Sequence, residues 1–332
     1  ERPTFTGFVS IEAMVLLAAA FNIVSSVSII LVNKQIASVC GFDFIITMLF
    51  LNFLTTASLL EFLSRRSWFE VKHLPTRDRW LVAGMALLTV LLNNCSNEAN
   101  SVGFYQITKL LIIPTVMSLE RLQGRSISYS RGVIISILVT AIGVVIATVS
   151  DFEVNVRGSI LAALSIVSTA QYQIWQGSKQ HEHGVTATQI TYSVAWPQSL
   201  AGCVSALIVD VLVPQLKVIV LMRPASLLDH KLSGQGDLFW IALCNLLAVM
   251  TNISVYGLIG KTSPVTYQIV GQLKTVLVVG FGYVFFDARV PLNWLLIRFS
   301  GVGVAVLGIF GYAMCKHAET KAIDKQTGKK EK

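Results

Sequence analysis

Charged residues are scarce in this chain. Asp, Glu, Lys and Arg make up 13% of its 332 residues, whereas 54% are hydrophobic. Soluble domains carry about 25% charged residues, so this composition excludes the ordinary soluble classes and predicts a polytopic membrane protein. The few acids within the apolar segments also argue against a proton pump built on a relay of carboxylates.

Catalytic and metal-binding motifs are missing as well. The sequence has no G-x-x-x-x-G-K-[ST] phosphate loop, no H-E-x-x-H and no G-x-S-x-G, so neither an ATPase nor an intramembrane hydrolase is expected. Its five cysteines are scattered without a C-x-x-C pair, which indicates neither a disulfide framework nor a zinc site. His181-Glu182-His183 lacks a third ligand nearby and is interpreted as a solvated loop motif. We expect no enzyme, no cofactor and no bound metal.

Long hydrophobic runs fill most of the chain. Windows of about 20 residues predict ten membrane-spanning helices, at 11–33, 44–64, 80–97, 101–120, 132–150, 158–179, 187–213, 238–260, 264–286 and 294–315. Most Lys and Arg residues lie in the termini and in the loops after the even-numbered helices, so both termini are predicted to be cytosolic. This topology, with anionic-lipid contact by the tail and by residues 65–79, explains the net charge of +8 without a nucleic-acid partner.

The two halves of the chain resemble each other. Asn100-Ser-Val-Gly-Phe-Tyr-Gln-Ile precedes Lys109, and Thr262-Ser-Pro-Val-Thr-Tyr-Gln-Ile precedes Lys274. Because each half has five helices, an odd number, the second half is predicted to be inverted. We therefore expect an all-α membrane protein with a 5+5 inverted repeat: residues 11–150, residues 158–315 and a basic cytosolic tail, 316–332. Such repeats are typical of alternating-access transporters, with the site near the midplane between the halves.

Lys274 is the most informative single residue. It lies near the middle of an otherwise apolar run, where a lysine costs about 2.5 to 3.5 kcal/mol. It is therefore predicted to face a watery cavity, a ligand, or a partner such as a backbone carbonyl or a helix-end carboxylate. Tyr267 and Gly271 share its helical stripe, and Gln268 and Thr275 run alongside. A ring, a gap and a cation on one helix favour a small anion with an aromatic base.

Further polar residues extend this candidate site. Lys109 and Tyr105 present a similar cation and ring from the first half of the chain. Amides and a tyrosine could contact a base or a sugar, but such groups also hold membrane helices together, so both interpretations stay open. The complete candidate set is Lys274, Thr275, Gly271, Tyr267, Gln268, Lys109, Tyr105, Asn22, Tyr192, Asn97 and Asn252.

Several of these motifs together are typical of a known family. They are Asn22-Ile-Val-Ser-Ser-Val, Asn33-Lys-Gln, Asn100-Ser-Val-Gly-Phe-Tyr-Gln-Ile with Lys109-Leu, and Ser263-Pro-Val-Thr-Tyr-Gln with Gly271 and Leu273-Lys-Thr. Over about residues 14–315, the chain resembles the nucleotide-sugar and triose-phosphate translocators of the drug/metabolite transporter superfamily. It looks most similar to the UDP-sugar branch best known from plants. The resemblance implies that UDP-galactose, UDP-rhamnose or UDP-xylose enters the Golgi lumen in exchange for UMP.

The resemblance also implies roles and alternatives. Lys274-Thr275 matches the Lys-Thr pair of nucleotide-sugar carriers, whereas plastid carriers of triose phosphate or phosphoenolpyruvate have Lys-Arg there. GDP-mannose carriers show Gly-Ala-Leu-Asn-Lys at this point, so a GDP-sugar is a weaker alternative. By the resemblance, Tyr267, Gly271 and Lys274-Thr275 line the sugar and phosphate end, and Tyr192 lies at the base end.

The C-terminal sequence suggests an address. Lys329-Lys-Glu-Lys has the form of a dilysine signal that cytosolic coat proteins recognise, although a plain charged tail has the same composition. The expected location is therefore the Golgi membrane or the ER membrane. The sequence does not indicate an oligomeric state.

Overall fold

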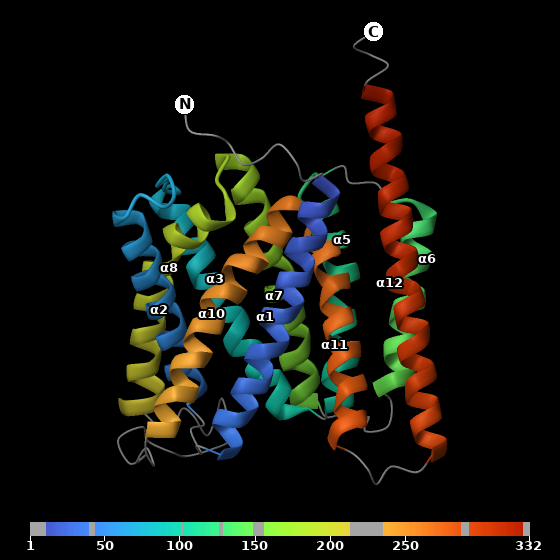
Figure 1. Cartoon of the computed structure of the whole chain (residues 1–332), viewed down its shortest axis with the longest axis horizontal. Coiled ribbons are helices and arrows are strands. Elements are labelled where there is room, and N and C mark those ends of the chain that lie inside the picture. Colours follow the sequence, from blue (N-terminus) through green and yellow to red (C-terminus); the bar gives the residue numbers. More distant parts are fainter. Residues whose placement is uncertain are drawn as a thin grey trace. The chain divides into compact units, whose positions relative to one another are not determined.

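The fold is helical throughout the part that the computed structural model describes, which is residues 11–39, 44–100, 102–125, 129–148, 156–212, 235–286 and 292–327. A helix occupies each of the ten predicted ranges, which confirms the all-α class (Figure 1). The elements are α1 (Ile11–Val39), α2 (Ile45–Arg65), α3 (Thr76–Ala99), α4 (Val102–Leu110), α5 (Ile112–Leu122), α6 (Arg131–Thr148), α7 (Val156–His183), α8 (Ala187–Ala206), the π-helix η2 (Leu207–Leu212), α10 (Gln235–Lys261), α11 (Pro264–Phe286) and α12 (Leu292–Thr327).

Six helices in the described residues are long and apolar enough to cross a bilayer. These stretches are Leu16–Asn33, Ile46–Arg65, Thr76–Asn97, Ala187–Val211, Gly236–Lys261 and Phe299–Glu319. The helix over Arg131–Ala147 is apolar but shorter. The protein is thus a multi-pass membrane protein, while ten spans, the inverted repeat and the cytosolic termini stay predictions.

The chain forms two compact units. The first combines Glu1–Ala99 with Leu161–Tyr267, and the second combines Asn100–Ile160 with Gln268–Lys332. Each unit therefore takes helices from both predicted repeats, and the unit boundaries fall inside α7 and α11. The predicted repeats are defined by the similarity between the two halves of the sequence, so their boundaries differ from those of the compact units.

In the first unit, α2 is joined to η2, which directly follows α8, at one end and to α8 at the other. At one end, Asp210 accepts hydrogen bonds from the Thr47 backbone N–H at 3.0 Å and from its hydroxyl at 2.6 Å. This carboxylate satisfies a donor of the first turn of α2, as a helix N-cap does. At the other end, the Tyr192 hydroxyl donates to Glu61 at 2.9 Å. The two helices consequently form a braced pair.

A proline in α8 explains an arginine contact. Pro197 lacks an N–H, so the carbonyl of Ser193, four residues earlier, loses its helical donor. Arg79 supplies the missing donor, because its Nε lies 3.0 Å from this carbonyl oxygen. The Ser193 hydroxyl in turn accepts from the Leu74 backbone N–H at 2.9 Å. The start of α3 is thereby fixed to the middle of α8.

Three helices end in the same backbone motif. Ser67, Gly124 and Gly184 follow α2, α5 and α7 with φ values of 56°, 77° and 56°. In each case the next residue's N–H bonds to the carbonyl five residues earlier, as Trp68 does to Leu63 at 3.1 Å. This is the Schellman motif, which favours glycine at the left-handed position. Ser67 is the non-glycine exception among them.

The turn between α7 and α8 is short because of its capping residues. Thr186 and Gln189 form a capping box, in which each side chain bonds to the other's backbone N–H. Val185 and Ile190, on either side of this box, are buried in one hydrophobic cluster. They correspond to a hydrophobic staple, which fixes the angle at which α8 begins.

In the second unit, α6 and α12 lie side by side (Figure 1). Glycines allow their backbones to approach closely: a Cβ on Gly301 would lie 2.5 Å from the Ala147 nitrogen. Gly143 and Gly308, which correspond in the two predicted repeats, have equally close neighbours in the facing backbone. Small residues at a membrane helix interface maximise van der Waals contact where lipid offers no hydrophobic driving force.

The turn before α6 is held by a buried phenol. The Tyr129 hydroxyl donates to Glu120 at 2.9 Å. Burial first, and then the neighbouring carboxylate, raise the pKa of Tyr129 above its ordinary value. The phenol therefore keeps its proton and remains a hydrogen-bond donor at physiological pH.

Candidate functional site

The helix that carries Lys274 begins with a strong sequence signal. Ser263 caps α11, since its hydroxyl accepts from the Thr266 N–H at 3.2 Å, and Pro264 takes the first helical position. The helix then continues without interruption through Lys274 to Phe286. Tyr267, Gly271 and Lys274 therefore lie on one stripe of one helix, as their spacing predicts.

The polar side chains of α11 are withdrawn from the surface. Lys274 is 8% exposed and Gln268 is 7% exposed. Gln272, which the sequence analysis did not single out, is 4% exposed. Three polar side chains are thus buried within two turns of an otherwise apolar helix.

Gly271 leaves room on the same helix. A Cβ placed on it would meet, among the described side chains, only the Gln268 Oε1 at 4.0 Å. The Thr275 hydroxyl lies nearby and donates to the Gly271 carbonyl at 3.4 Å. Among the described residues, this glycine therefore makes no close contact with another helix, unlike Gly143, Gly301 and Gly308 of α6 and α12.

A proline interrupts the helix that carries Lys109. We expected one helix over 101–120, but the structure has α4 and α5, separated at Leu111. Pro114 cannot donate to the carbonyl of Leu110, and the Leu111 N–H instead bonds to Thr108 at 3.0 Å. Lys109 thus lies in the last turn before the break. Interrupted helices of this kind line the sites of many transporters.

Lys109 and Tyr105 contact each other. The Lys109 ammonium lies 4.2 Å from the centroid of the Tyr105 ring, which is a cation–π contact between residues one turn apart. Leu110 and Val276 belong to one hydrophobic cluster, with Val144 of α6 and Ala305 of α12. The segments that carry the two candidate lysines therefore contribute to the same core of the second unit.

The candidate amides lie in the first unit, in varied surroundings. Asn22 of α1 is fully buried and donates to the Ser254 hydroxyl of α10 at 2.8 Å, while its own Oδ1 has no partner among the described residues. Asn252 donates to Thr56 of α2 at 3.3 Å. Both thus hold helices together, and Asn22 keeps one spare acceptor. Asn97, near the end of α3, is exposed.

Tyr192 is also in the first unit, at the end of the α2 and α8 pair. Besides bonding to Glu61, its ring packs against Phe69 at 5.7 Å and His73 at 5.3 Å between ring centroids. Trp196, one turn further on, is 44% exposed. This face of α8 thus points outward, and the structure assigns Tyr192 a bracing contact that its spacing did not predict.

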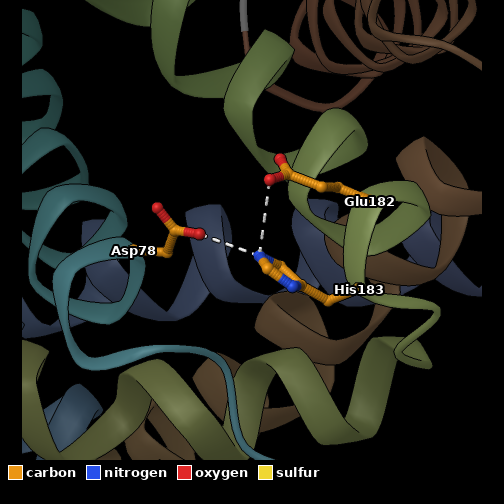
Figure 2. Close-up of side chains that lie close together, drawn as sticks. All are labelled: Asp78, Glu182 and His183. Atoms are coloured by element: carbon orange, nitrogen blue, oxygen red, sulfur yellow. Dashed lines mark hydrogen bonds and ion pairs between the residues drawn. The ribbon is translucent and has the colours of Figure 1, made fainter.

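The His181-Glu182-His183 motif receives a second acidic group, Asp78, from α3. Figure 2 shows His183 between Asp78 and Glu182, with its Nε2 2.8 Å and 3.9 Å from their carboxylates. Lys179 lies 3.1 Å from Asp78 and 2.7 Å from Glu182. Because an ammonium already faces both carboxylates, the group is better described as an ion cluster than as a metal site. It joins the first turn of α3 to the end of α7, where the helix dipoles favour the Asp78 carboxylate and the Lys179 ammonium, respectively.

One sequence-based prediction lies outside the described residues. It is the tail signal Lys329-Lys330, since the description ends at residue 327. The other candidate residues lie on helices that the structure describes. Together these helices define a helical membrane protein with buried polar side chains inside its candidate membrane spans.

Comparison with known proteins identifies the family within this class of membrane proteins. UDP-xylose transporter 3 of Arabidopsis thaliana is 36% identical over 313 residues, which cover 93% of this chain and 83% of that protein. UDP-xylose transporter 2 of the same plant is 34% identical over 315 residues, with 93% and 84% covered. UDP-rhamnose/UDP-galactose transporter 3 is 34% identical over 309 residues, with 92% and 84% covered. No family model matches the chain.

The identity and coverage of these matches show that the chain belongs to the plant-type nucleotide-sugar transporters. It is therefore a transporter and not an enzyme. This confirms the resemblance that the motifs around Asn22, Lys109 and Lys274 indicate.

Proposed function

We propose that the protein is a secondary antiporter that exchanges a cytosolic UDP-sugar, such as UDP-galactose, UDP-rhamnose or UDP-xylose, for lumenal UMP by alternating access. The observation that carries the proposal is the similarity, over 93% of the chain, to transporters named for UDP-xylose and for UDP-rhamnose and UDP-galactose. The proposed location is the Golgi membrane or the ER membrane. In this proposal, coat proteins recognise the Lys329-Lys330 tail, which determines the location and takes no part in transport.

Lys274 supplies the charge that a nucleotide requires. Its burial on α11 costs free energy, and an anionic phosphate close to the ammonium offsets that cost. Thr275, next in the chain, offers a hydroxyl where a carrier of a bare phosphate ester would offer a second strong cation. A diphosphate that is linked to a base and a sugar can distribute its binding over further hydrogen bonds and ring contacts.

The remaining candidates have supporting roles in this proposal. Gly271 leaves the backbone of α11 open to close approach by the ligand, with Tyr267 and Gln268 beside it. Lys109 is already stacked on Tyr105, so a phosphate can approach this cation from the side opposite the ring. Asn22 Oδ1 is an acceptor without a described partner, and Asn252, Asn97 and Tyr192 provide polar groups for the nucleoside.

Exchange follows from the same charges. When the site is loaded, ligand phosphate compensates the buried lysine, and either UDP-sugar or UMP can do so. When the site is empty, the cation lacks the ligand phosphate and keeps only its contacts within the protein, which is less favourable at membrane depth. A ligand can bias the two access states only through different free energies of interaction with them. We therefore expect the loaded carrier to reorient much faster than the empty one.

Counterflow in proteoliposomes tests this function. Vesicles preloaded with UMP, GMP, CMP or inorganic phosphate are supplied with labelled UDP-xylose, UDP-galactose, UDP-rhamnose, GDP-mannose or triose phosphate. The proposal expects saturable uptake of a UDP-sugar that depends on internal UMP. Uptake that is driven by GMP, CMP or phosphate instead would contradict the assignment of base and counter-substrate.

A further inference from the structure

Large aromatic side chains are exposed at one end of the first unit. Trp68 is 78% exposed, Phe62 is 55% exposed and Trp80 is 47% exposed. They come from the last turn of α2, the α2–α3 loop (residues 66–75) and the first turns of α3. Since α2 and α3 both contain candidate membrane spans, this loop lies where the chain leaves the bilayer.

The backbone places Trp68 outward for a definite reason. Ser67 adopts the left-handed conformation, and the Trp68 N–H bonds back to Leu63, which ends α2 abruptly. In many Schellman motifs the residue at this position packs back onto its own helix. Trp68 is instead the most exposed large apolar side chain of this loop. A tryptophan in this position matches the aromatic residues that anchor proteins at the membrane surface.

Exposed cations come from the same stretch of the chain as these rings. Arg66 lies over the Phe62 ring, with its guanidinium carbon 5.4 Å from the centroid, and it is exposed. Arg77, in the first turn of α3, is exposed as well. Two of the three acids between residues 61 and 79 are engaged, Glu61 by Arg65 at 3.0 Å and Asp78 by Lys179 at 3.1 Å, while the third, Glu70, is exposed. The same stretch carries five Lys and Arg residues, so cations remain in excess. The surface that faces outward is therefore basic as well as aromatic.

The loop is held in place from within. The Gln189 amide donates to the Glu70 carbonyl at 2.8 Å, and the Lys72 ammonium donates to the Gly184 carbonyl at 3.1 Å. Leu74 is bonded to Ser193, as described above. With its ends on two helices and its middle bonded to the α7–α8 turn, the loop presents Trp68 and the arginines on an ordered base. Preorganised groups bind with a smaller entropic cost.

We propose that Trp68, Arg66 and Arg77 form a binding site for the headgroup of an anionic phospholipid. The tryptophan ring lies among the acyl carbonyls, and the guanidinium groups donate to the lipid phosphate and its additional anionic group. Guanidinium is suited to this, because its planar donors match phosphate oxygens in pairs. A lipid is the partner that the geometry favours, because the site continues directly from two membrane-spanning helices.

Brominated lipids test the proposal through the fluorescence of Trp68. The full chain is reconstituted with either brominated phosphatidylserine or brominated phosphatidylcholine at the same mole fraction. The signal of Trp68 is obtained as wild type minus Trp68→Phe. We expect the serine lipid to quench Trp68 about threefold more strongly than the choline lipid. Equal quenching by the two lipids, or no quenching by either, overturns the proposal.

Two double arginine variants distinguish lipid binding at this site from a general electrostatic attraction between the protein and the bilayer. In the double variant Arg66→Gln/Arg77→Gln, the preference for the serine lipid is expected to disappear. The matched control Arg121→Gln/Arg131→Gln removes two exposed arginines from α5 and α6 and leaves the preference unchanged. A preference that survives Arg66→Gln/Arg77→Gln overturns the proposal.

Salt provides a measurement that needs no arginine variant. The Debye length falls from about 8 Å at 0.15 M to about 3 Å at 1 M ionic strength, so the preference of the wild type must decrease over this range. If the double variant does not fold, this titration decides alone. A preference that is unchanged at high salt shows that the arginines do not select the headgroup.

Discussion

At the scale of single residues, Lys274 poses the sharpest energetic question. Its side chain is 8% exposed on an otherwise apolar helix. Insertion of a lysine at the bilayer centre costs about 2.5 to 3.5 kcal/mol, which a purely structural role would have to offset by contacts alone. A role in ligand binding explains why the chain carries this cost. Substitution of Lys274 should then affect transport and stability in different ways.

Lys274→Met should therefore reduce exchange without reducing stability. We expect UMP-dependent uptake of UDP-sugar to fall by about 10-fold to 100-fold, the value of one charged hydrogen bond. The thermal unfolding midpoint should stay the same or rise, because a buried cation is removed. Lys261→Met, at the exposed end of α10, is the matched control and should leave uptake unchanged. Unchanged uptake in Lys274→Met would exclude Lys274 from the site.

Gly271 allows a second separation of binding from folding. A Cβ has space at Gly271 and at Gly303 of α12 among the described side chains. Alanine at either position should be neutral or stabilise the helix by about 0.5 to 1 kcal/mol. Only Gly271→Ala should weaken UDP-sugar uptake, with a rise in the half-saturating concentration, since only this glycine lies beside Lys274. Equal uptake by the two variants would contradict close approach of the ligand at Gly271.

At the scale of secondary structure, two prolines show how one missing N–H is handled in different ways. Pro114 ends α4 and leaves a break after Lys109. Pro197 leaves α8 continuous, because Arg79 donates to the carbonyl that the proline frees. The same residue type thus produces an interruption in one unit and an arginine-bridged helix in the other.

A double-mutant cycle measures the arginine bridge. Arg79→Met removes the donor to the Ser193 carbonyl, and we expect it to cost about 1 to 3 kcal/mol because a buried acceptor loses its partner. In a Pro197→Ala background, the new backbone N–H takes over this carbonyl, so the same arginine substitution should cost about 1 kcal/mol less. Thermal unfolding of the four proteins gives the coupling. Additive effects would show that Arg79 stabilises α8 by another contact.

Local signals predicted the helices well but not their contacts. The extent of a helix depends on signals that act over a few residues, so the sequence contains them directly. Examples are the hydrophobic runs, Ser263-Pro264 and the glycines after α5 and α7. The break at Leu111 was missed, because a proline inside an apolar run is compatible with either a kink or a break. The bond of Tyr192 to Glu61 joins residues 131 positions apart, and helical spacing carries no information on such pairs.

The candidate site divides in the same way. Lys274 was predicted to avoid lipid, and its burial agrees with this, whereas the burial of Gln268 was not predicted. Gln272 was overlooked, although it lies on the same helix and is equally buried. The second acid of the cluster at His181-Glu182-His183 is Asp78, which lies more than a hundred residues earlier in the chain. Only the tertiary structure brings it to the motif.

At the scale of the whole molecule, the distribution of basic residues predicts a membrane topology, which the positions of the helices alone do not test. Basic residues are concentrated in the loops after the even-numbered predicted helices, and Ser67 and Gln123 lie in two of these loops. Ser233 and Ala288 lie in loops after odd-numbered helices, outside the described residues. If ten helices cross the bilayer with both termini in the cytosol, the first pair faces the cytosol and the second pair faces the lumen.

Single cysteines at these four positions test the topology, in a background that lacks the five native cysteines. In sealed Golgi vesicles, whose cytosolic face is outward, a membrane-impermeant maleimide should label Ser67→Cys and Gln123→Cys directly. Ser233→Cys and Ala288→Cys should react only after detergent opens the vesicles. One span more or fewer between two positions would place the second position on the opposite side of the membrane. Labelling of Ser67→Cys and Ser233→Cys from the same side would therefore contradict the proposed arrangement. Since UDP-sugar must enter from the cytosol and UMP from the lumen, the same vesicles also connect orientation to the direction of exchange.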